Sequence, residues 1–501
     1  MSPICRGVPF CFAFFVSMAL AQPRAITILH VNDIHGHFLP ERVSGSDDTL
    51  LVGGFEALSH YLRIERTRSP NSLFMDAGDI MTGNPICNRK HRGVFGGALV
   101  ELLEMVDCKV GVLGNHEFDI SQENARKLAA ISAYPTLCAN LVDSTQYLFA
   151  PNGMTIHEIG GLHVGVIGLI YEELRAETNP SNLQGLEVKD IAQTAQTLID
   201  QLDPVTDLIL LLTHNGVDKD RELARKIHHA DVIVGGHSHS RLLEPLRENG
   251  ILIVQAGCHL RELGVLDLEV AGDTVCSYRG RLIPVVVENI QPDLRVAAFC
   301  DSFRVLLDAE YGEVIGQLAV DWIRGYHEES NVGNWICDRM RDVFNADIAL
   351  VNAGGIRTDI PAGPVTRLQI AELLPFNNGI VLFNATGAQL QRFAERQVSA
   401  HSLREHGLVE MSGMKIGYRL HGERLDTLIC EIGGESFEPN RTYRVVSIDY
   451  MAASQWDRYL GFQPQDVQLT GQLLSDFVMA QVQEAEDSIH SEVEGRLSRL
   501  P

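Results

Sequence analysis

Residues 110–119 of the chain are Val110-Gly111-Val112-Leu113-Gly114-Asn115-His116-Glu117-Phe118-Asp119. The first four form a short apolar run that is typical of a buried strand. An amide oxygen, an imidazole and two carboxylates follow within five residues. Layered α/β folds place ligand sites beyond the carboxyl ends of their strands. The stretch therefore predicts a functional site at a strand end, to which other strands are expected to bring further ligands.

Short apolar runs alternate with helical patterns from Ala25 to about Ile290. The runs that we expect to be strands are 26–31, 73–75, 110–113, 164–167, 208–212, 232–234 and 252–255. Between them, apolar residues at helical spacing predict amphipathic helices, one marked by Phe55, Leu58 and Leu62. This alternation predicts a layered α/β domain.

Five of these predicted strands are followed by side chains that can bind a metal ion. They are, in chain order, Asp33 and His35, Asp79, Asn115, His214, and His237 and His239. At a single strand end, a solvated loop or an Asp that caps its own turn is an adequate alternative. Coincidence at all five ends is improbable. Carboxylates mixed with imidazoles, with Asp79 shared, suit two divalent transition-metal ions about 3.5–4 Å apart. We expect Glu117 to be structural, holding a neighbouring loop.

The pattern changes near 291–313, where Asp293 opens a predicted helix that reaches 307 or beyond. A second α/β or α+β unit follows, so that the 501 residues are expected to form two domains. Its landmarks are Asn331-Val332-Gly333-Asn334, Asn352-Ala353-Gly354-Gly355-Ile356-Arg357, Leu374-Pro375-Phe376 and a late strand at 443–448.

The first 21 residues are expected to be a signal peptide that is cleaved after Ala21. Arg6 precedes an apolar run from Val8 to Leu20, and Ala19-Leu20-Ala21 is a small-residue cleavage site. A retained N-terminal anchor is the alternative, but the run is short for a membrane span. The C-terminus lacks the apolar tail of a lipid-anchored protein. We expect a periplasmic or secreted protein without a membrane anchor.

The charge of the chain bears on its partners, and its cysteines bear on possible disulfide bonds. The net charge of −24 argues against a nucleic acid polymer as partner, while small anions stay possible beside local cations or metals. Eight cysteines follow the signal segment without a repeating spacing, and the sequence does not assign their pairing. The oligomeric state is also left open.

Together these motifs resemble two known families. Asn32-Asp33-Ile34-His35-Gly36, Gly78-Asp79, Gly114-Asn115-His116-Glu117, His214 and Gly236-His237-Ser238-His239 are similar to the calcineurin-like metallophosphoesterase signature. The landmarks after residue 330 resemble the C-terminal domain of 5′-nucleotidases, in the order found in secreted 5′-nucleotidases and periplasmic UDP-sugar hydrolases. The resemblance implies a four-layer α/β/β/α domain (22–290), a linker helix (291–313) and a smaller α/β nucleotide-binding domain (314–501).

The resemblance also implies roles for the predicted ligands. Asp33, His35 and His239 would hold one metal ion, and Asn115, His214 and His237 the other, with Asp79 bridging. The ions would be of the Zn, Mn or Co type, and a water that they activate would attack phosphorus. His116, oriented by Asp119, would stabilise charge on the phosphoryl group or the leaving oxygen.

For the substrate, the resemblance implies a phosphate clamp from Asn352 and Arg357 and an aromatic sandwich from Phe376 and Tyr450. Two departures stand out. The family has a further Arg shortly before the Asn331 motif, where this chain has Tyr326-His327-Glu328-Glu329 and an offset Arg324. The Gly-Gly-Asp that contacts ribose is replaced by Ser454-Gln455-Trp456-Asp457-Arg458, in which Asp457 is the expected substitute.

The expected function is an exported dinuclear-metal phosphohydrolase that acts on nucleotides. A relative that acts on 2′,3′-cyclic nucleotides, UDP-sugars or a sulfur ester is the alternative among enzymes. A secreted nucleotide-binding protein with weak catalysis is the alternative from another class. The complete ligand set, with His116 and Asp119, argues against the last of these.

Overall fold

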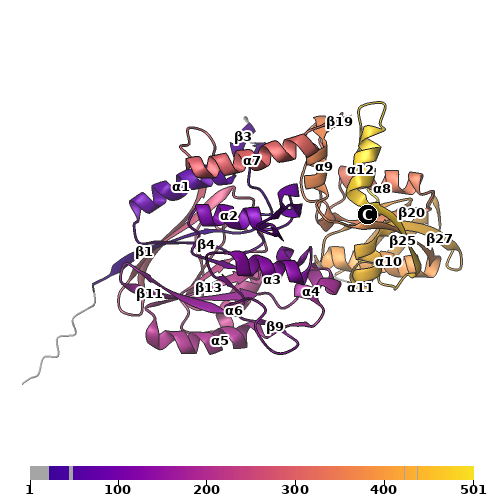
Figure 1. Cartoon of the computed structure of the whole chain (residues 1–501). Coiled ribbons are helices and arrows are strands. Elements are labelled where there is room, and N and C mark those ends of the chain that lie inside the picture. The colour runs from indigo at the N-terminus through magenta and orange to yellow at the C-terminus, as the bar shows by residue number, and fades with distance from the viewer. Residues whose placement is uncertain (1–21, 45–48, 405, 423, 437, 501) are drawn as a thin grey trace, which may run out of the picture.

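The computed structural model describes residues 22–44, 49–404, 406–422, 424–436 and 438–500. Two domains lie side by side (Figure 1), the first with the N-terminal strands and the second with the C-terminal helices. The predicted signal peptide lies outside the described residues.

The first domain contains two six-stranded mixed sheets. The first has the order β18 (Val275–Pro284), β17 (Glu262–Val270), β1 (Arg24–Val31), β4 (Ser72–Asp76), β7 (Val110–Val112) and β8 (Thr136–Leu137). The strands from β1 to β8 are parallel, and β17 and β18 extend the sheet in antiparallel register.

The second sheet has the order β10 (Met154–Ile159), β11 (Leu162–Ile170), β13 (Leu208–His214), β14 (Val232–Gly235), β16 (Ile251–Val254) and β15 (Leu246–Glu248). Its four central strands are parallel, with antiparallel strands at both edges. All seven predicted strands are therefore present. The apolar runs did not reveal the antiparallel strands β10, β15, β17 and β18. Strands β10, β15 and β18 are edge strands with many polar, partly exposed residues, whereas β17 is an inner, mostly buried strand whose apolar residues are interrupted by Asp267 and Glu269.

Alternation of side chains along each strand produces four layers. Ile28 and Met75 of the first sheet pack against Leu210 and Val234 of the second in one apolar core. The next residues along the strands, such as Leu29, face outward. They pack under α1 (Phe55–Arg68), α2 (Gly97–Met105) and α7 (Leu294–Tyr311) on one side, and under α5 (Ile191–Leu202) and α6 (Val217–Lys226) on the other. This confirms the predicted α/β/β/α layering.

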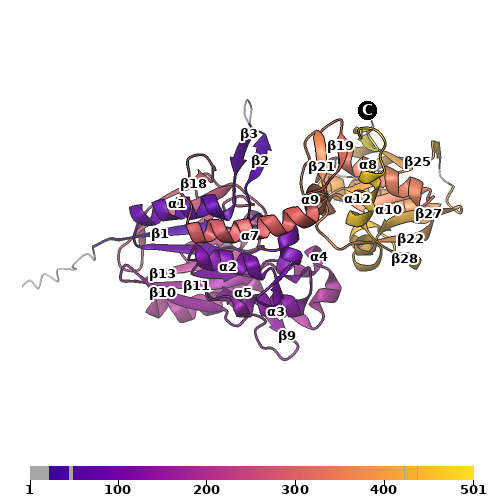
Figure 2. The same ribbon diagram turned by 45° about the horizontal axis from the view of Figure 1, so that its top comes forward.

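Helix α7 joins the two domains. It runs over α1 and α2 towards α9 (Arg367–Leu373), as Figure 2 shows. Asp293 begins it by accepting a hydrogen bond from the backbone N–H of Arg295. The helical connector that the sequence predicted after Asp293 is therefore present, and it ends at Tyr311.

The second domain is built on a five-stranded sheet in the order β23 (Val409–Ser412), β20 (Ile348–Asn352), β27 (Thr442–Ile448), β22 (Gly379–Thr386) and β28 (Gln465–Leu473). A four-stranded sheet accompanies it, with the order β26 (Glu435–Ser436), β25 (Arg424–Ile432), β24 (Met414–His421) and β29 (Leu497–Arg499). One core joins both sheets to α8 (Asn331–Val343), α10 (Gly387–Leu403) and α12 (Leu474–Gln483). The predicted late strand corresponds to β27.

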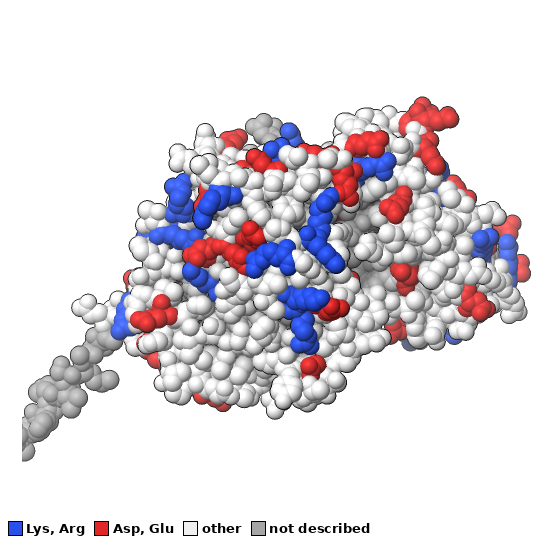
Figure 3. All heavy atoms as spheres, in the orientation of Figure 1, with Lys and Arg blue, Asp and Glu red and all other residues white. Residues whose placement is uncertain are grey.

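The remaining strands form short pairs: β2 (Glu41–Ser44) with β3 (Thr49–Val52), β5 (Lys90–His91) with β6 (Val94–Phe95), β9 (Leu141–Asp143) with β12 (Leu186–Val188), and β19 (Val314–Leu318) with β21 (Gly363–Thr366). The eight cysteines after the signal segment are free thiols in the structure. No helix among the described residues has the length and apolar character that a membrane crossing requires. On the face seen in Figure 3, basic and acidic side chains are interspersed.

Candidate active site

The seven predicted ligands gather at one edge of the two facing sheets. Asp33 and His35 follow β1, Asp79 follows β4, and Asn115 follows β7. From the second sheet, His214 is the last residue of β13, and His237 and His239 follow β14. Because these strands are parallel and the sheets lie face to face, their carboxyl ends open onto the same place.

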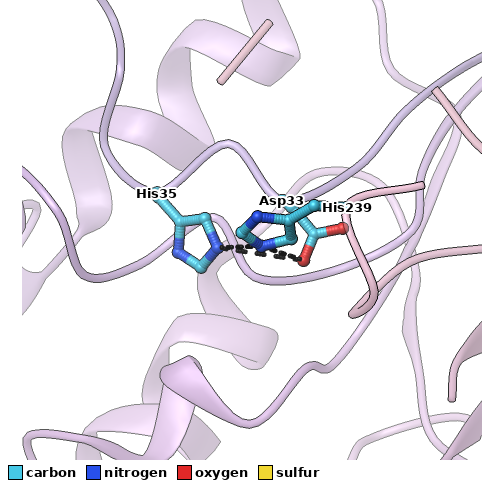
Figure 4. Close-up of side chains that lie close together, drawn as sticks. All are labelled: Asp33, His35 and His239. Carbon is cyan, nitrogen blue, oxygen red and sulfur yellow. Dashed lines mark hydrogen bonds and ion pairs between the residues drawn. The ribbon is translucent and has the colours of Figure 1, made fainter. Parts of the chain in front are cut away.

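Asp33, His35 and His239 form the first cluster (Figure 4). The Nε2 atoms of the two histidines are 3.0 Å apart, and His239 Nε2 is 3.3 Å from Asp33 Oδ1. Asp33 and His35 are almost completely buried. The three side chains therefore present their donor atoms to one point.

Asp79, His214 and His237 form the second cluster. His214 Nε2 is 3.0 Å from Asp79 Oδ2 and 4.0 Å from Asp33 Oδ1, so the two clusters adjoin. Asn115 joins this cluster, because its Oδ1 is 3.1 Å from His237 Nδ1. This geometry brings all seven predicted residues together, in the two groups that the resemblance implied, while their role as ligands stays a prediction.

The ring nitrogens fit a site for cations. The Nδ1 atoms of His35 and His214 contact the carbonyl oxygens of Met81 and Ala77, which can only accept a hydrogen bond. Each Nδ1 therefore carries a proton, and the Nε2 atom of each ring faces the cluster, where it can bind a second proton or a metal ion. His214 Nε2 is buried and has no hydrogen bond of acceptable geometry.

The buried carboxylates also demand positive charge. Burial acts to lower the pKa of His214, but Asp79 and Asp33 outweigh it and raise that pKa to about 10. Either a proton or a metal ion can balance the negative charge of these carboxylates. The facing Nε2 atoms of His35 and His239 favour metal ions, since a cation between them uses both lone pairs.

The backbone at the centre is unusual. Among the seven residues, five have positive φ angles between 50° and 77°: Asp33, His35, Asp79, His237 and His239. Residues other than glycine rarely adopt this left-handed conformation, which costs free energy and concentrates at functional sites. The chain accepts this cost where it turns side chains of adjacent loops towards one point.

His116 lies beside the clusters and has a different set of contacts. Its Nδ1 is 2.6 Å from Asp119 Oδ2, and Thr82 donates a hydrogen bond to the same carboxylate. Burial acts to lower the pKa of His116, but Asp119 and Asp79 outweigh it and raise that pKa above its usual value. The raised pKa favours the protonated ring, and His116 Nε2 lies 3.9 Å from Asp79 Oδ2 at the edge of the centre.

Glu117 holds the loop of Asp79, as the sequence predicted. Its buried carboxylate accepts hydrogen bonds from the backbone N–H groups of Gly114, Asp79, Ile80 and Met81. One side chain thus connects the loop after β7 to the loop after β4.

A cavity of about 570 Å³ opens from the two Asp and His clusters towards the second domain. Four of the five predicted substrate residues line it: Asn352, Arg357, Phe376 and Tyr450. The side-chain oxygen of Asn352 is buried without a hydrogen-bond partner. The Phe376 ring is 5.8 Å from the His116 ring, and the Arg357 guanidinium is 5.9 Å from the Phe376 ring. The predicted substrate residues therefore lie next to the predicted catalytic residue.

Asp457 does not belong to this group. Helix α11 (Trp456–Tyr459) begins one residue before it, which places Asp457 on an exposed face, where its carboxylate accepts a hydrogen bond from the Arg458 N–H. Tyr459 lines the cavity instead. The expectation that Asp457 replaces the family's ribose contact thus finds no support in its position.

Arg324, which is offset in the sequence from the family's Arg before the Asn331 motif, lines the cavity. Backbone hydrogen bonds in both directions join Trp322 to Ile360, so the segment of Arg324 runs beside that of Arg357. Burial, and the neighbouring guanidinium of Arg357, lower the pKa of Arg324. Among the described residues, neither guanidinium has a carboxylate within ion-pair distance, so both are available to an anionic ligand.

Sequence reasoning missed the residues after β11. Tyr171 follows this strand, and its ring stacks on that of His237 at 4.5 Å. Glu177 and Asn179 line the cavity. The signal was available, because the predicted strand at 164–167 is also parallel to its neighbours and ends at the same edge. Tyr171 offers no carboxylate, amide or imidazole, and for that reason it did not stand out.

Contacts between the domains flank the cavity. Arg458 forms an ion pair of 2.7 Å with Glu177, and Gln455 donates a hydrogen bond to the Arg175 carbonyl. On the other side, Asn84 donates to Glu372 of α9 at 2.6 Å.

Replacing Glu117 tests how the centre is supported. In Glu117→Gln, an NH₂ group faces backbone N–H donors that lose their acceptor. We expect a loss of about 1–3 kcal/mol in the free energy of unfolding and weaker metal binding, measured by denaturant unfolding and by metal titration. The matched control is Glu123→Gln on α3 (Gln122–Ile131), where an exposed carboxylate pairs only with Lys127. Equal stability of the two variants would contradict this account of Glu117.

Comparisons with known proteins agree with this architecture. Residues 26–241 match the calcineurin-like phosphoesterase family, and residues 314–463 match the 5′-nucleotidase C-terminal domain family. The chain is 27% identical to the 5′-nucleotidase of Mus musculus over 90% of its own length and 88% of that protein. It is 26% identical to endonuclease YhcR of Bacillus subtilis over 87% of its own length, but spans only 37% of that protein.

Among solved structures, the 5′-nucleotidase precursor of Thermus thermophilus superposes with a TM-score of 0.84 at 26% identity, covering 95% of this chain and 99% of that one. The order of the two domains, their fold and the clustered Asp and His side chains agree with these matches. The chain belongs to the calcineurin-like phosphoesterases that carry a 5′-nucleotidase C-terminal domain, and it is a metal-dependent phosphoric ester hydrolase.

Proposed function

We propose that this chain hydrolyses nucleotides to release phosphate, using two divalent metal ions. One observation carries the proposal. The cavity that adjoins the Asp and His clusters and His116 is lined, on the side of the second domain, by the guanidinium groups of Arg324 and Arg357 and by the aromatic rings of Phe376 and Tyr450. A nucleotide carries an anionic phosphate and an aromatic base, and these match the guanidinium groups and the aromatic rings of this lining.

The metal ions would be held by the seven residues in two groups. Asp33, His35 and His239 form one, and Asn115, His214 and His237 form the other, with Asp79 between them. Two cations there would supply Lewis acidity and would lower the pKa of a bound water to near neutrality. The mixture of imidazole and carboxylate ligands suits Zn, Mn or Co.

The remaining residues orient the substrate and stabilise its negative charge. Arg324, Arg357 and Asn352 bind phosphate oxygens, and Phe376 with Tyr450 holds the base. His116 is fixed by its hydrogen bond with Asp119, so its Nε2–H donates to the oxygen on which negative charge develops. Its raised pKa favours the protonated form of that donor.

Export and the domain limits belong to the same proposal. We retain 1–21 as a signal peptide, 22–290 as the catalytic domain, 291–313 as the linker and 314–501 as the substrate domain. The matched ranges 26–241 and 314–463, and the position of α7 between them, support this division. The protein would then act in the periplasm or outside the cell on small-molecule substrates.

Metal removal tests the use of metal ions. Dialysis against EDTA is expected to abolish phosphate release, because the buried carboxylates then lack the cations that activate water. Addition of Zn²⁺, Mn²⁺ or Co²⁺ is expected to restore it, as measured by a phosphate assay. Circular dichroism before and after dialysis checks that the fold persists. Undiminished hydrolysis by the folded, metal-free protein would refute the proposal.

Substitution of His116 tests its role. His116→Asn removes a hydrogen-bond donor that is proposed to act in the transition state, so kcat is expected to fall about 10²–10³-fold with little change in KM. The control is His157→Asn on β10, which is outside the centre and is expected to keep the kcat of the unsubstituted protein. If His116→Asn turned over at that same rate, the residue would have no catalytic role.

A substrate panel with Arg324→Met tests specificity. Nucleoside 5′-monophosphates are expected to have the highest kcat/KM, above 2′,3′-cyclic nucleotides, UDP-sugars, sulfur esters and p-nitrophenyl phosphate. Arg324→Met is expected to lower kcat/KM for nucleotides about 10–100-fold by loss of a charge-assisted hydrogen bond. Arg339→Met, on the exposed face of α8, is the matched control. Preference for another ester would reassign the substrate, and nucleotide binding without hydrolysis of any ester would indicate a binding protein.

A further inference from the structure

Asn179 lines the substrate cavity, and neither the sequence motifs nor the proposed reaction uses it. It follows α4 (Leu174–Glu177) of the first domain, which lies next to α11 of the second (Figure 1). Its side-chain oxygen accepts hydrogen bonds from the backbone N–H of Ser181 at 3.1 Å and from the Ser181 hydroxyl at 2.9 Å. Because a backbone N–H can only donate, the oxygen must be the atom that faces Ser181, and the orientation of the amide is fixed.

The amide nitrogen of Asn179 therefore points away from its own turn. Among the described residues, all hydrogen bonds of this side chain are made by its oxygen, so the two N–H groups on Nδ2 are available to a ligand. The neighbouring carboxylate of Glu177 is already paired with Arg458. Asn179 thus offers the cavity hydrogen-bond donors only, since its acceptor is in use.

The loop of Asn179 is held against the segment of His116. Asn182 donates hydrogen bonds to the carbonyl oxygens of Phe118 and Asp119 at 2.9 and 3.0 Å. These carbonyls lie at the end of the short helical turn that begins at His116. The position of Asn179 relative to the proposed phosphate site is therefore fixed.

The same loop contacts the turn of Tyr450 in the second domain. Ser454, the last residue of the turn Tyr450–Ser454, has its hydroxyl 3.5 Å from Asn179 Oδ1, and Gln455 donates a hydrogen bond to the Thr178 carbonyl at 3.4 Å. Asn179 is therefore adjacent to the aromatic residue that the proposed function assigns to the base. A base that stacks there would meet the Nδ2 donors at one of its edges.

We propose that Asn179 is a specificity-determining residue, which selects bases that carry a carbonyl oxygen over bases that carry an amino group at the same ring position. The inference rests on the proposed hydrolysis of nucleotides. Guanine, hypoxanthine and uracil present a carbonyl oxygen that accepts from Nδ2–H, where adenine and cytosine present an N–H₂ donor. Two donors that face each other both stay unpaired, which costs affinity.

The test compares two pairs of nucleotides that differ at this ring position. They are inosine with adenosine 5′-monophosphate, and uridine with cytidine 5′-monophosphate. In each pair the nucleotide with the carbonyl group is expected to have the higher kcat/KM in a phosphate-release assay, by about 10–100-fold. The difference is expected in KM, since the contact to the base is equally strong in the ground state and in the transition state.

Substitutions of Asn179 supply the second arm of the test. Asn179→Asp keeps the oxygen that accepts from Ser181 and replaces the donors by a second acceptor, so it is expected to reverse both preferences. Asn179→Ala is expected to abolish them. A merely structural role would instead lower kcat/KM for all four nucleotides alike. Asn384→Asp, which adds the same charge on the exposed face of β22, is the matched control and is expected to keep the preferences of the unsubstituted protein.

Thermal unfolding checks that each variant is folded. The inference is overturned if the unsubstituted protein shows no preference within the two pairs, if folded Asn179→Asp keeps the same ratios, or if Asn384→Asp changes them as much. Hydrolysis of nucleotides with these results would refute the inference alone. Absence of hydrolysis for every nucleotide would refute the proposed function, and the inference with it.

Discussion

The centre of this protein depends on two carboxylates, Asp33 and Asp79, that are buried where water cannot stabilise their charge. Burial of unpaired charge costs several kcal/mol. The surrounding imidazoles do not relieve it as neutral rings, because His35 and His214 turn their lone pairs towards the same place. Only positive charge resolves this arrangement. The need to gather these side chains around positive charge explains why the loops adopt left-handed conformations and why Glu117 holds the loop of Asp79.

The two-sheet architecture makes such a concentration of charge feasible. The sheets bury their inner faces against each other, so the strands cannot shift register without exposing apolar side chains. Their carboxyl ends are therefore fixed relative to one another, and predicted ligands that are far apart in the chain converge.

Under the proposed function, selectivity resides mainly in the second domain, which contributes guanidinium groups and aromatic rings to a cavity whose proposed reactive groups belong to the first. Contacts such as Arg458 with Glu177 join the two parts around the cavity. Division of labour between domains allows the reaction to stay constant while the bound molecule changes. Phe376 near His116 marks where the two functions meet.

The sequence by itself determined the layered fold, the strand ends that carry the seven predicted ligands, and the supporting part of Glu117. These features depend on local patterns, because an apolar run followed by polar residues specifies both a strand and its end. Only the tertiary structure decided the surroundings of the substrate. Arg324 reaches the cavity because its segment pairs with that of Ile360, and Asp457 is turned outward because a helix begins at Trp456. Asn179 meets the turn of Tyr450 from a distant part of the chain, and such contacts between loops leave no periodic pattern in the sequence.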